Sequence, residues 1–327
     1  CAGVRPIVWQ GLSPSTIGVL ITRLLVGVFV SWIQVFSFLE GLLLGAIVSS
    51  TDAAAIFMML RSRNAKLPKR LTQLLELESG SNDPMAVVLT IALIQLLMEP
   101  STSFGGLVLF FVTEMVVGTV LGVVMGEIMR RAFNALDLRV EGIYLVLSVA
   151  LALLTYGLTT FLHGSGFLAV YLAGLVMQRK PFVHQQNVLR FHDGLAWLMQ
   201  VTMFLVLGLQ VFPASLVPFA WVGLLVSLFL IVIARPAAVH LSLAFSSMPY
   251  REQTLMAWAG LRGSVPIILA TFPQLAGVKQ ADTIFHLVFF ITLTSVLLQG
   301  TTIAWATRVL KIDLPPPDRS QTHPPTH

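Results

Sequence analysis

The stretch LLELESGSNDPMAVVLTIALIQLL, residues 74–97, places acidic and polar side chains at the head of a run that is apolar enough to cross a bilayer. Glu78 and Asp83 are the acidic residues closest to the apolar part. A charge at mid-membrane costs about 2.5 to 3.5 kcal/mol even on the most lenient insertion scale. Because charges inside membrane helices mark functional sites, this stretch predicts one.

The composition of the chain predicts an all-α polytopic membrane protein. Its 327 residues are 56% hydrophobic and 11% charged, whereas soluble domains carry roughly 25% charged residues. Apolar runs of about 20 residues recur, and a helix of that length spans a hydrocarbon core of about 30 Å. Ten spans are predicted near residues 16–36, 38–60, 73–98, 104–130, 141–162, 165–178, 193–212, 216–245, 252–276 and 282–310.

The two ends of the sequence predict an incomplete membrane domain over residues 1–312 and a short tail. The chain begins with Cys1 rather than methionine, and no signal peptide precedes the first apolar run, so N-terminal helices are expected to be missing. This single cysteine also excludes an internal disulfide framework. Residues 313–327 are rich in proline and lack an apolar period, which predicts a disordered tail.

Lysine and arginine predict the orientation of the spans, because cytoplasmic loops near membrane ends collect these residues. Loop 61–70, RSRNAKLPKR, carries five of them. When the ten spans are threaded alternately from that loop, 16 of the 20 basic residues fall on its side, three fall within spans and only Lys279 falls opposite. Both ends of the chain are therefore expected in the cytoplasm. The net charge of +5 follows from this bias, so no nucleic-acid partner is expected.

Two of the predicted spans are interrupted by polar residues. Segment 38–60, FLEGLLLGAIVSSTDAAAIFMML, carries two serines, Thr51 and Asp52 halfway along, and such residues weaken a helix by bonding their own backbone. Segment 252–276 is interrupted by glycine, serine and proline beside Arg262. Broken backbone at mid-membrane is tolerated where it lines a cavity or binds an ion, so a pair of interrupted spans predicts the binding site of a secondary transporter.

Helical spacing groups possible cation ligands in the opening stretch. Ser79 and Asp83 are four residues apart, as are Glu78 and Asn82, so each pair stacks on one face. A carboxylate, a hydroxyl and an amide oxygen are hard donors that suit an alkali cation, predicted here at Asp83. Burial favours the protonated form of a carboxylate, so cation and proton are expected to compete for Asp83.

Glu78 is expected to have a structural role. Buried charges usually pair, and Arg262 is one of few basic residues near the centre of a span. We therefore predict a Glu78–Arg262 ion pair that joins the two interrupted regions without carrying the cation. Arg235, which precedes Pro236, is expected to extend toward the membrane surface or to bind a freed carbonyl.

A glycine repeat in the segment 104–130 allows close helix approach. Gly118, Gly122 and Gly126 recur every four residues, on one face of a helix. Both internal packing and a dimer contact fit such a stripe, and internal packing is the favoured interpretation.

The sequence resembles the NhaP-type branch of the monovalent cation:proton antiporters, especially the bacterial potassium/proton antiporters called cell-volume-regulation protein A. SGSNDPMAV, residues 79–87, is the most specific of the matching motifs. The other matching stretches are LLLGAIVSSTDAAAIF, GSGFLAVYLAGLVM, RFHDGLAWLMQVTMFLVLGLQVFP, AGLRGSVPIILATFP and HLVFFITLTSVLLQGTTIAWATRVL.

The resemblance implies an inverted-repeat fold in which two broken helices cross inside a core that moves against a dimerising panel. It implies that Asp83 carries the cation or the proton, and that Asn82, Ser79, Thr51 and Asp52 belong to the ion-binding region. Glu78 and Arg262 match the family's stabilising pair. The resemblance further implies electroneutral exchange of K⁺ or Na⁺ for H⁺ in a bacterial inner membrane, by a homodimer that serves pH and cell-volume homeostasis. The family has about three more N-terminal helices.

Two other functions were weighed. A polar break in a membrane helix could line a cation channel, but a carboxylate beside an amide suits a site that binds and then reorients. Asp52 and Asp83 could form the dyad of an intramembrane aspartic protease, but such enzymes carry a Gly-x-Gly-Asp motif and Asp83 follows SGSN. No metal-spaced Cys or His cluster and no phosphate loop occurs, so neither an enzyme nor a cofactor is predicted.

Overall fold

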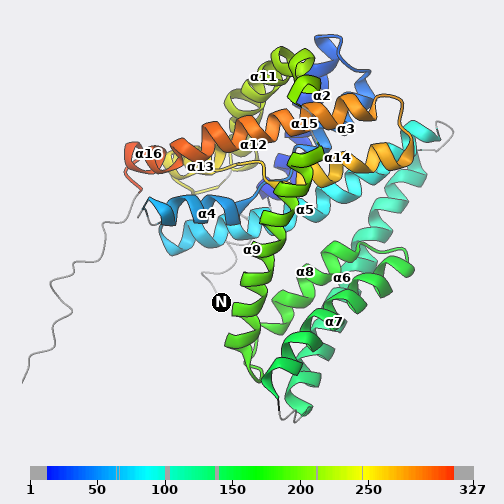
Figure 1. Ribbon diagram of the computed structural model, residues 1–327, viewed down its shortest axis with the longest axis vertical. Helices are drawn as coiled ribbons and strands as arrows, with labels where there is room; N and C mark the ends of the chain where they lie inside the picture. The colour runs from blue at the N-terminus through cyan, green and yellow to red at the C-terminus, as the bar shows by residue number, and fades with distance from the viewer. Residues whose placement is uncertain are drawn as a thin grey trace, which may run out of the picture. The chain divides into compact units, whose positions relative to one another are not determined.

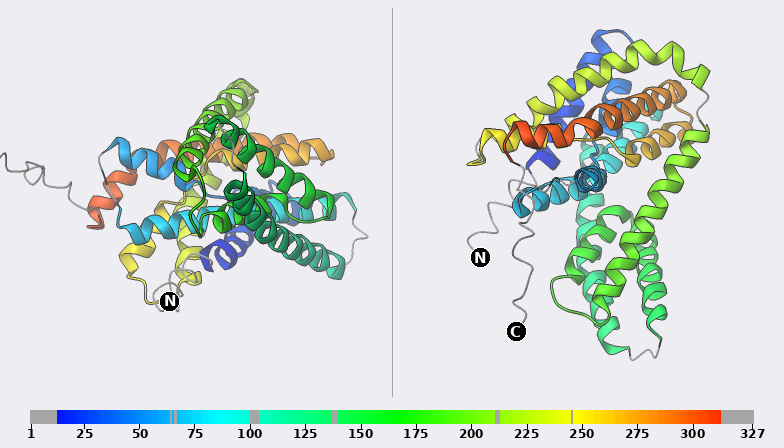
Figure 2. Two further views of the ribbon diagram at one scale, coloured as in Figure 1. Left: turned by 90° about the horizontal axis from the view of Figure 1, so that it is seen from below. Right: turned by 60° about the vertical axis from the view of Figure 1, so that its left-hand side comes forward.

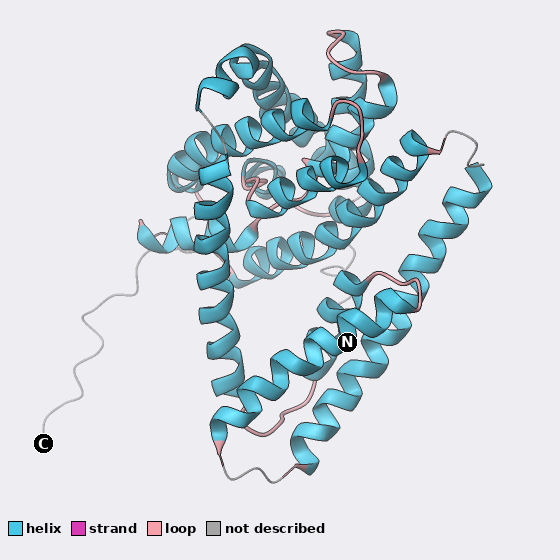
Figure 3. Cartoon of the chain, turned by 45° about the vertical axis from the view of Figure 1, so that its right-hand side comes forward, coloured by secondary structure: helices cyan, strands magenta, loops and turns pink. Residues whose placement is uncertain are grey.

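The computed structural model describes residues 13–312, apart from 64, 66, 100–103, 137–139, 211–212 and 245. Within these residues every regular element is a helix, as Figure 3 shows. The predicted all-α class is therefore confirmed. The predicted tail at 313–327 lies outside the described residues.

The helices follow the predicted spans along the chain (Figure 1). Each of the ten predicted segments contains one helix, a broken pair of helices, or helices joined through a π-helical turn. The elements are η1 (Pro14–Gly18), α2 (Val19–Trp32), α3 (Phe38–Ile47), α4 (Ala53–Ser62), α5 (Lys69–Met98), α6 (Phe104–Ala135), α7 (Glu141–Phe161), α8 (Gly166–Met177), α9 (Gln185–Gln210), α10 (Pro213–Leu216), η2 (Val217–Phe219), α11 (Ala220–Phe229), η3 (Leu230–Ala234), α12 (Arg235–Ser242), α13 (Tyr250–Trp258), α14 (Ser264–Ala276), α15 (Ala281–Ser295), η4 (Val296–Gly300) and α16 (Thr301–Val309).

Six helical stretches among the described residues are long and apolar enough to cross a membrane by length and composition. They are Pro14–Trp32, Lys69–Met98, Gly105–Ala135, Glu141–Phe161, Val217–Ser242 and Ala281–Val309. Shorter apolar helices make up much of the remaining predicted spans, and two of them, α3 and α4, are the halves of one interrupted segment.

Both predicted interruptions are present. The first separates Ile47 at the end of α3 from Ala53 at the start of α4. The second separates Trp258 at the end of α13 from Ser264 at the start of α14. With ten residues each, α3 and α4 reach only about half of the way through a hydrocarbon core of about 30 Å. The two halves together make one span with non-helical backbone at its middle.

Local capping residues account for the first broken helix. Ser37 opens α3 with a capping box, in which Glu40 N donates to the Ser37 hydroxyl and the Glu40 carboxylate accepts from Ser37 N. Asp52 opens α4 by accepting a hydrogen bond from Ala55 N at 2.9 Å. Such N-caps satisfy amides that the first turn of a helix leaves unpaired, so the break is specified by the local sequence.

The chain forms two compact units. Unit 1 comprises Cys1–Asn82, Phe219–Pro266 and Leu287–His327, and unit 2 comprises Asp83–Pro218 and Ile267–His286. Helix α5 begins in unit 1 and continues into unit 2. Both of these helix interruptions belong to unit 1.

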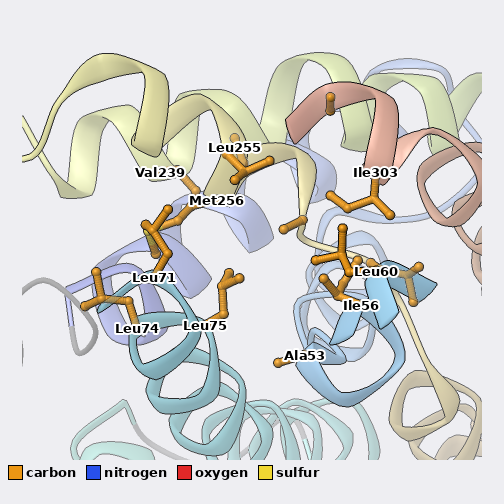
Figure 4. Close-up of a cluster of buried hydrophobic side chains, with 14 of the residues drawn as sticks. Ala53, Ile56, Leu60, Leu71, Leu74, Leu75, Val239, Leu255, Met256 and Ile303 are labelled. Atoms are coloured by element: carbon orange, nitrogen blue, oxygen red, sulfur yellow. The ribbon is translucent and has the colours of Figure 1, made fainter. Parts of the chain in front are cut away.

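An apolar cluster joins helices of unit 1 that are far apart in the sequence (Figure 4). Ile56 of α4, Leu71 of α5 and Met256 of α13 are completely buried in it. Helix α16 adds Ile303, and α12 adds Val239. In a bilayer, close van der Waals packing of this kind associates helices, because lipid tails are as apolar as the side chains. The cluster therefore packs the half-helix α4 against α16 and joins both to α5 and α13.

In unit 2, helices α6, α7 and α8 lie side by side (Figures 1 and 2), and the glycine repeat of α6 contacts α8. A Cβ atom on Gly122 would lie 2.7 Å from the carbonyl oxygen of Ala169. One on Gly126 would lie 2.7 Å from the carbonyl oxygen of Ala173. Side-chain carbons do not approach backbone so closely, so only glycine lets the two helices meet. The stripe therefore serves internal packing, as favoured from the sequence.

Gly122→Ala is expected to lower the melting temperature of the protein in detergent, because the added methyl group must push α8 away. Overpacking of this kind costs about 1 to 3 kcal/mol. Gly174→Ala in α8 is the matched control, because a Cβ atom there meets nothing within 4 Å and alanine is the better helix former. A melting temperature unchanged by Gly122→Ala would contradict the close approach of the two helices.

Candidate functional site

The two helix interruptions contact each other within unit 1. Asp52 N donates a hydrogen bond of 2.8 Å to the carbonyl oxygen of Leu261, which joins the first break to the second. A Cβ atom on Gly263 would overlap the Asp52 carboxylate, so the second break needs glycine at this position. The two pieces of non-helical backbone therefore lie in direct contact and form one site region.

Two side chains of α5 bind the backbone of the first break. The Ser79 hydroxyl donates to the carbonyl oxygen of Thr51 at 2.7 Å and accepts from Ala53 N at 3.4 Å. The Asn82 amide donates to the Thr51 hydroxyl at 2.6 Å and accepts from Thr51 N at 3.4 Å. Thr51 and Asn82 are buried, and Ser79 is partly exposed. The structure thus brings together three of the predicted ion-binding residues.

Asp83 follows Asn82 in α5 and lies one turn beyond Ser79 on the same face, as helical geometry requires. The helix runs unbroken from Lys69 to Met98 with Pro84 inside it. The side chain of Asp83 is partly exposed. Asp83 therefore directly follows the residue that binds the first break, and its role as an ion carrier stays a prediction.

Asp52 serves as the N-cap of α4. Its carboxylate accepts from Ala55 N, while its backbone amide is bound to Leu261. Asp52 therefore has a structural role as a helix cap. A further contribution of Asp52 to an ion-binding shell stays a prediction.

The predicted ion pair between Glu78 and Arg262 is wrong, because Glu78 pairs with Arg235. Arg235 Nη2 donates to Glu78 Oε1 at 2.5 Å, and the two side chains are 3% and 1% exposed. The same nitrogen lies 3.4 Å from the carbonyl oxygen of Met256. Arg235 begins α12 directly after the π-helical turn η3, and its side chain is buried rather than extended toward a membrane surface. The ion pair ties α5 to α12.

Arg262 instead binds the backbone of the first break, just after the half-helix α3. Its Nη1 donates to the carbonyl oxygens of Ser49 and Ser50, at 2.8 Å each. These two carbonyls belong to the non-helical break after α3, where no helical amide is in place to bind them, so a buried guanidinium supplies the donors that they need. This competing acceptor set is the physical reason that Arg262 does not bind Glu78 directly.

Two buried side chains that sequence reasoning did not select hold the second break. Ser295 Oγ accepts from Arg262 N at 2.9 Å and donates to Gln299 Oε1 at 2.5 Å. Gln299 Nε2 donates to the carbonyl oxygen of Trp258 at 2.8 Å. Both residues are completely buried. Their presence in an apolar span, four residues apart, is a signal that the sequence offers, since buried polar groups require partners.

The residues 6–309 match the family model described as sodium/hydrogen exchanger, transmembrane. The chain belongs to the sodium/hydrogen exchanger family. The predicted resemblance is therefore confirmed, and with it a multi-pass membrane protein. Secondary transporters form their ion sites where helices are broken near the middle of the membrane, so the two interruptions of this chain are the place to look for such a site.

Relatives in this exchanger family include named antiporters. The chain is 42% identical over 318 residues to the K(+)/H(+) antiporter NhaP2 of Shewanella sp. (strain ANA-3), covering 96% of this chain and 55% of that relative. It is 28% identical to the Na(+)/H(+) antiporter NhaG of Bacillus atrophaeus, covering 88% of this chain and 56% of the relative. The chain thus spans about half the length of the curated relatives it matches.

Among solved structures, the chain is similar to that of the sodium proton antiporter MjNhaP1 from Methanocaldococcus jannaschii at pH 8. The sequence identity is 26% and the TM-score is 0.81, with 94% of this chain and 79% of that chain covered. This likeness confirms the predicted antiporter fold.

Proposed function

We propose that the protein exchanges a monovalent cation for H⁺ across a membrane by alternating access. The observation that carries the proposal is that the two broken helices meet at Asp52, beside Thr51. Ser79 and Asn82 of α5 bind Thr51, and Asn82 directly precedes Asp83. Such a centre offers hydroxyl, amide, carbonyl and carboxylate oxygens at mid-membrane. These are the donors that alkali cations take after partial dehydration.

In the proposed cycle Asp83 binds either a proton or the cation, so loading one releases the other. Asn82, Ser79, Thr51 and Asp52 complete the shell of the cation. A protonated Asp83 and a cation-bound Asp83 carry the same net charge, and Asn82 beside it is neutral. The exchange is therefore one cation for one proton and electroneutral, driven by either ion gradient.

The names of the relatives guide the choice of cation. Relatives named K(+)/H(+) antiporters are 42% identical to the chain, and the relative named Na(+)/H(+) antiporter is 28% identical. K⁺ is therefore the proposed substrate. Na⁺ is the alternative, because both ions take the same oxygen donors and differ in the cavity size they need.

The proposed setting is the inner membrane of a bacterium, where the protein acts as a homodimer. The bias of basic residues supports an orientation with both ends of this chain in the cytoplasm. In that setting, exchange of K⁺ or Na⁺ for H⁺ adjusts internal pH and cell volume.

Everted membrane vesicles loaded with a pH-sensitive dye test the function. In vesicles from cells that express the natural protein containing these 327 residues, added K⁺ is expected to restore the fluorescence quenched by respiration. Na⁺, Li⁺ and Rb⁺ added in turn give the selectivity, and vesicles without the protein are the control. A response equal to the control for every cation would contradict antiport. A conductive current with unitary steps would favour a channel.

A further inference from the structure

The π-helical turn η4 places Ser295 and Gln299 against the second helix interruption in unit 1. It lies between α15 and α16, and Ser295 directly precedes it. A π turn holds an extra residue compared with an α-helix, and such turns occur often at functional sites. Gln299 is the buried residue of this turn, and Ser295 is 0% exposed. Two polar side chains without contact to water therefore lie next to the break.

The direction of each hydrogen bond in this group is determined by the groups at its ends. Arg262 N can only donate, so Ser295 Oγ accepts from it, and the single hydroxyl proton of Ser295 goes to Gln299 Oε1. The carbonyl of Trp258 can only accept, so the Gln299 nitrogen faces it. The amide of Gln299 thus has one orientation that satisfies all three bonds.

Arg262 extends this chain of bonds to the candidate ion site. Its backbone is held by Ser295, and its guanidinium binds the carbonyl oxygens of Ser49 and Ser50. The next residue is Thr51, whose hydroxyl and amide are bound by Asn82. A series of hydrogen bonds of 2.5 to 2.9 Å therefore runs from Trp258, through Ser295 and Arg262, to the carbonyls of the residues before Thr51.

We propose that Ser295 and Gln299 are positioning residues of the cation site, which act through Arg262. They fix the position of the Arg262 guanidinium, which binds the carbonyl oxygens of Ser49 and Ser50. Because Thr51 follows Ser50, the positions of the Thr51 oxygens depend on these bonds. This inference rests on the proposed function, because it assigns the oxygens to a transported cation. It differs from a role in packing alone, since loss of the bonds alters how tightly a cation is bound.

Three variants test the proposal. Ser295→Ala removes the hydroxyl group, whereas Ser295→Thr keeps one. Gln299→Leu replaces the amide with an apolar side chain of similar size. Thr307→Ala is the matched control, because Thr307 is a completely buried hydroxyl of α16 that bonds only locally, to the Ala304 carbonyl oxygen at 2.9 Å. All four are measured in the natural protein, with melting temperatures to correct for the amount of folded protein.

Hydrogen–deuterium exchange tests the structural part without transport. Ser295→Ala and Gln299→Leu are expected to speed amide exchange in a peptide that covers residues 48–53. This peptide contains the first break, whereas both substitutions lie beside the second. Ser295→Thr and Thr307→Ala are expected to leave that peptide unchanged. Unchanged exchange at 48–53 in both Ser295→Ala and Gln299→Leu would overturn the proposal, because no coupling would reach the first break.

Transport kinetics test the functional part. Ser295→Ala and Gln299→Leu are expected to raise the apparent KM for K⁺ about 3- to 10-fold, the equivalent of one neutral buried hydrogen bond, with Ser295→Thr near the wild type. A maximal rate that falls with an unchanged KM would overturn the positioning role. If the wild type exchanges no cation, the proposed function fails, and amide exchange still decides whether the two residues control the first break.

Discussion

Asp83→Asn is expected to reduce cation-evoked dequenching in everted vesicles to the level of vesicles without the protein. Asparagine has nearly the same size, so it keeps the packing of α5, but it neither binds a proton near neutral pH nor carries a negative charge. Without that charge, an alkali cation entering the site loses the counter-ion at residue 83 that offsets its lost hydration. The substitution therefore removes both substrates at once, which is a larger effect than loss of a single ligand.

Asp193→Asn is the matched control for this prediction, because Asp193 is an exposed aspartate on α9 of unit 2. It is expected to exchange K⁺ at the rate of the wild type. Asp83→Glu keeps the charge and shifts its position, so a raised KM with residual exchange is expected. Dequenching that survives in Asp83→Asn at the level of Asp193→Asn would remove Asp83 from the carrier role.

The parts of the fold that could be predicted are those encoded by neighbouring residues. Thr51 and Asp52 interrupt an apolar run, and the cap that Asp52 gives to α4 uses an amide three residues away. Ser79 and Asn82 share one surface of α5 because of helical spacing alone. These features need no knowledge of tertiary structure, so the broken helices and the polar face of α5 were accessible from local sequence. The grouping of Thr51 with Ser79 and Asn82 joins residues that are 28 and 31 positions apart, and only the family resemblance implied it.

The pairing of buried charges could not be predicted in the same way. Glu78 and Arg235 are 157 residues apart, and Arg23, Arg235 and Arg262 all fall within predicted spans. The sequence shows that a buried acid needs a basic partner, but it does not show which of three is within reach. The deciding competitor was the first break, where the carbonyls of Ser49 and Ser50 bind the guanidinium of Arg262.

The π-helical turns were also hidden from the sequence. An extra residue in one turn rotates everything after it relative to a regular helix, so the face occupied by Gln299 cannot be read from a period of 3.6. The same holds for Arg235, which follows η3. Side chains that a regular helix would point elsewhere are thereby directed at the site region of unit 1.

Glu78→Gln is expected to destabilise the protein strongly, because it leaves Arg235 charged and buried without its partner. Removing one member of a buried ion pair costs about 3 to 5 kcal/mol. The expected result is a lower melting temperature in detergent and a smaller yield of monodisperse protein. Glu127→Gln is the matched control, since Glu127 binds two arginines on α6 and its side chain is 36% exposed. Exposed pairs of this kind contribute about 0 to 1 kcal/mol.

A second substitution identifies the partner of Glu78. Arg235→Met removes the unpaired charge, so the double variant Glu78→Gln with Arg235→Met is expected to regain much of the lost stability. Glu78→Gln with Arg262→Met is expected to be less stable than Glu78→Gln alone, because the carbonyls of Ser49 and Ser50 then lose their donor while Arg235 stays unpaired. With the single variants Arg235→Met and Arg262→Met also measured, the two double-mutant cycles separate the alternatives, because a large coupling is expected with Arg235 and near-additive losses with Arg262. Recovery with Arg262→Met and none with Arg235→Met would restore the pairing expected from the sequence and contradict the ion pair between α5 and α12.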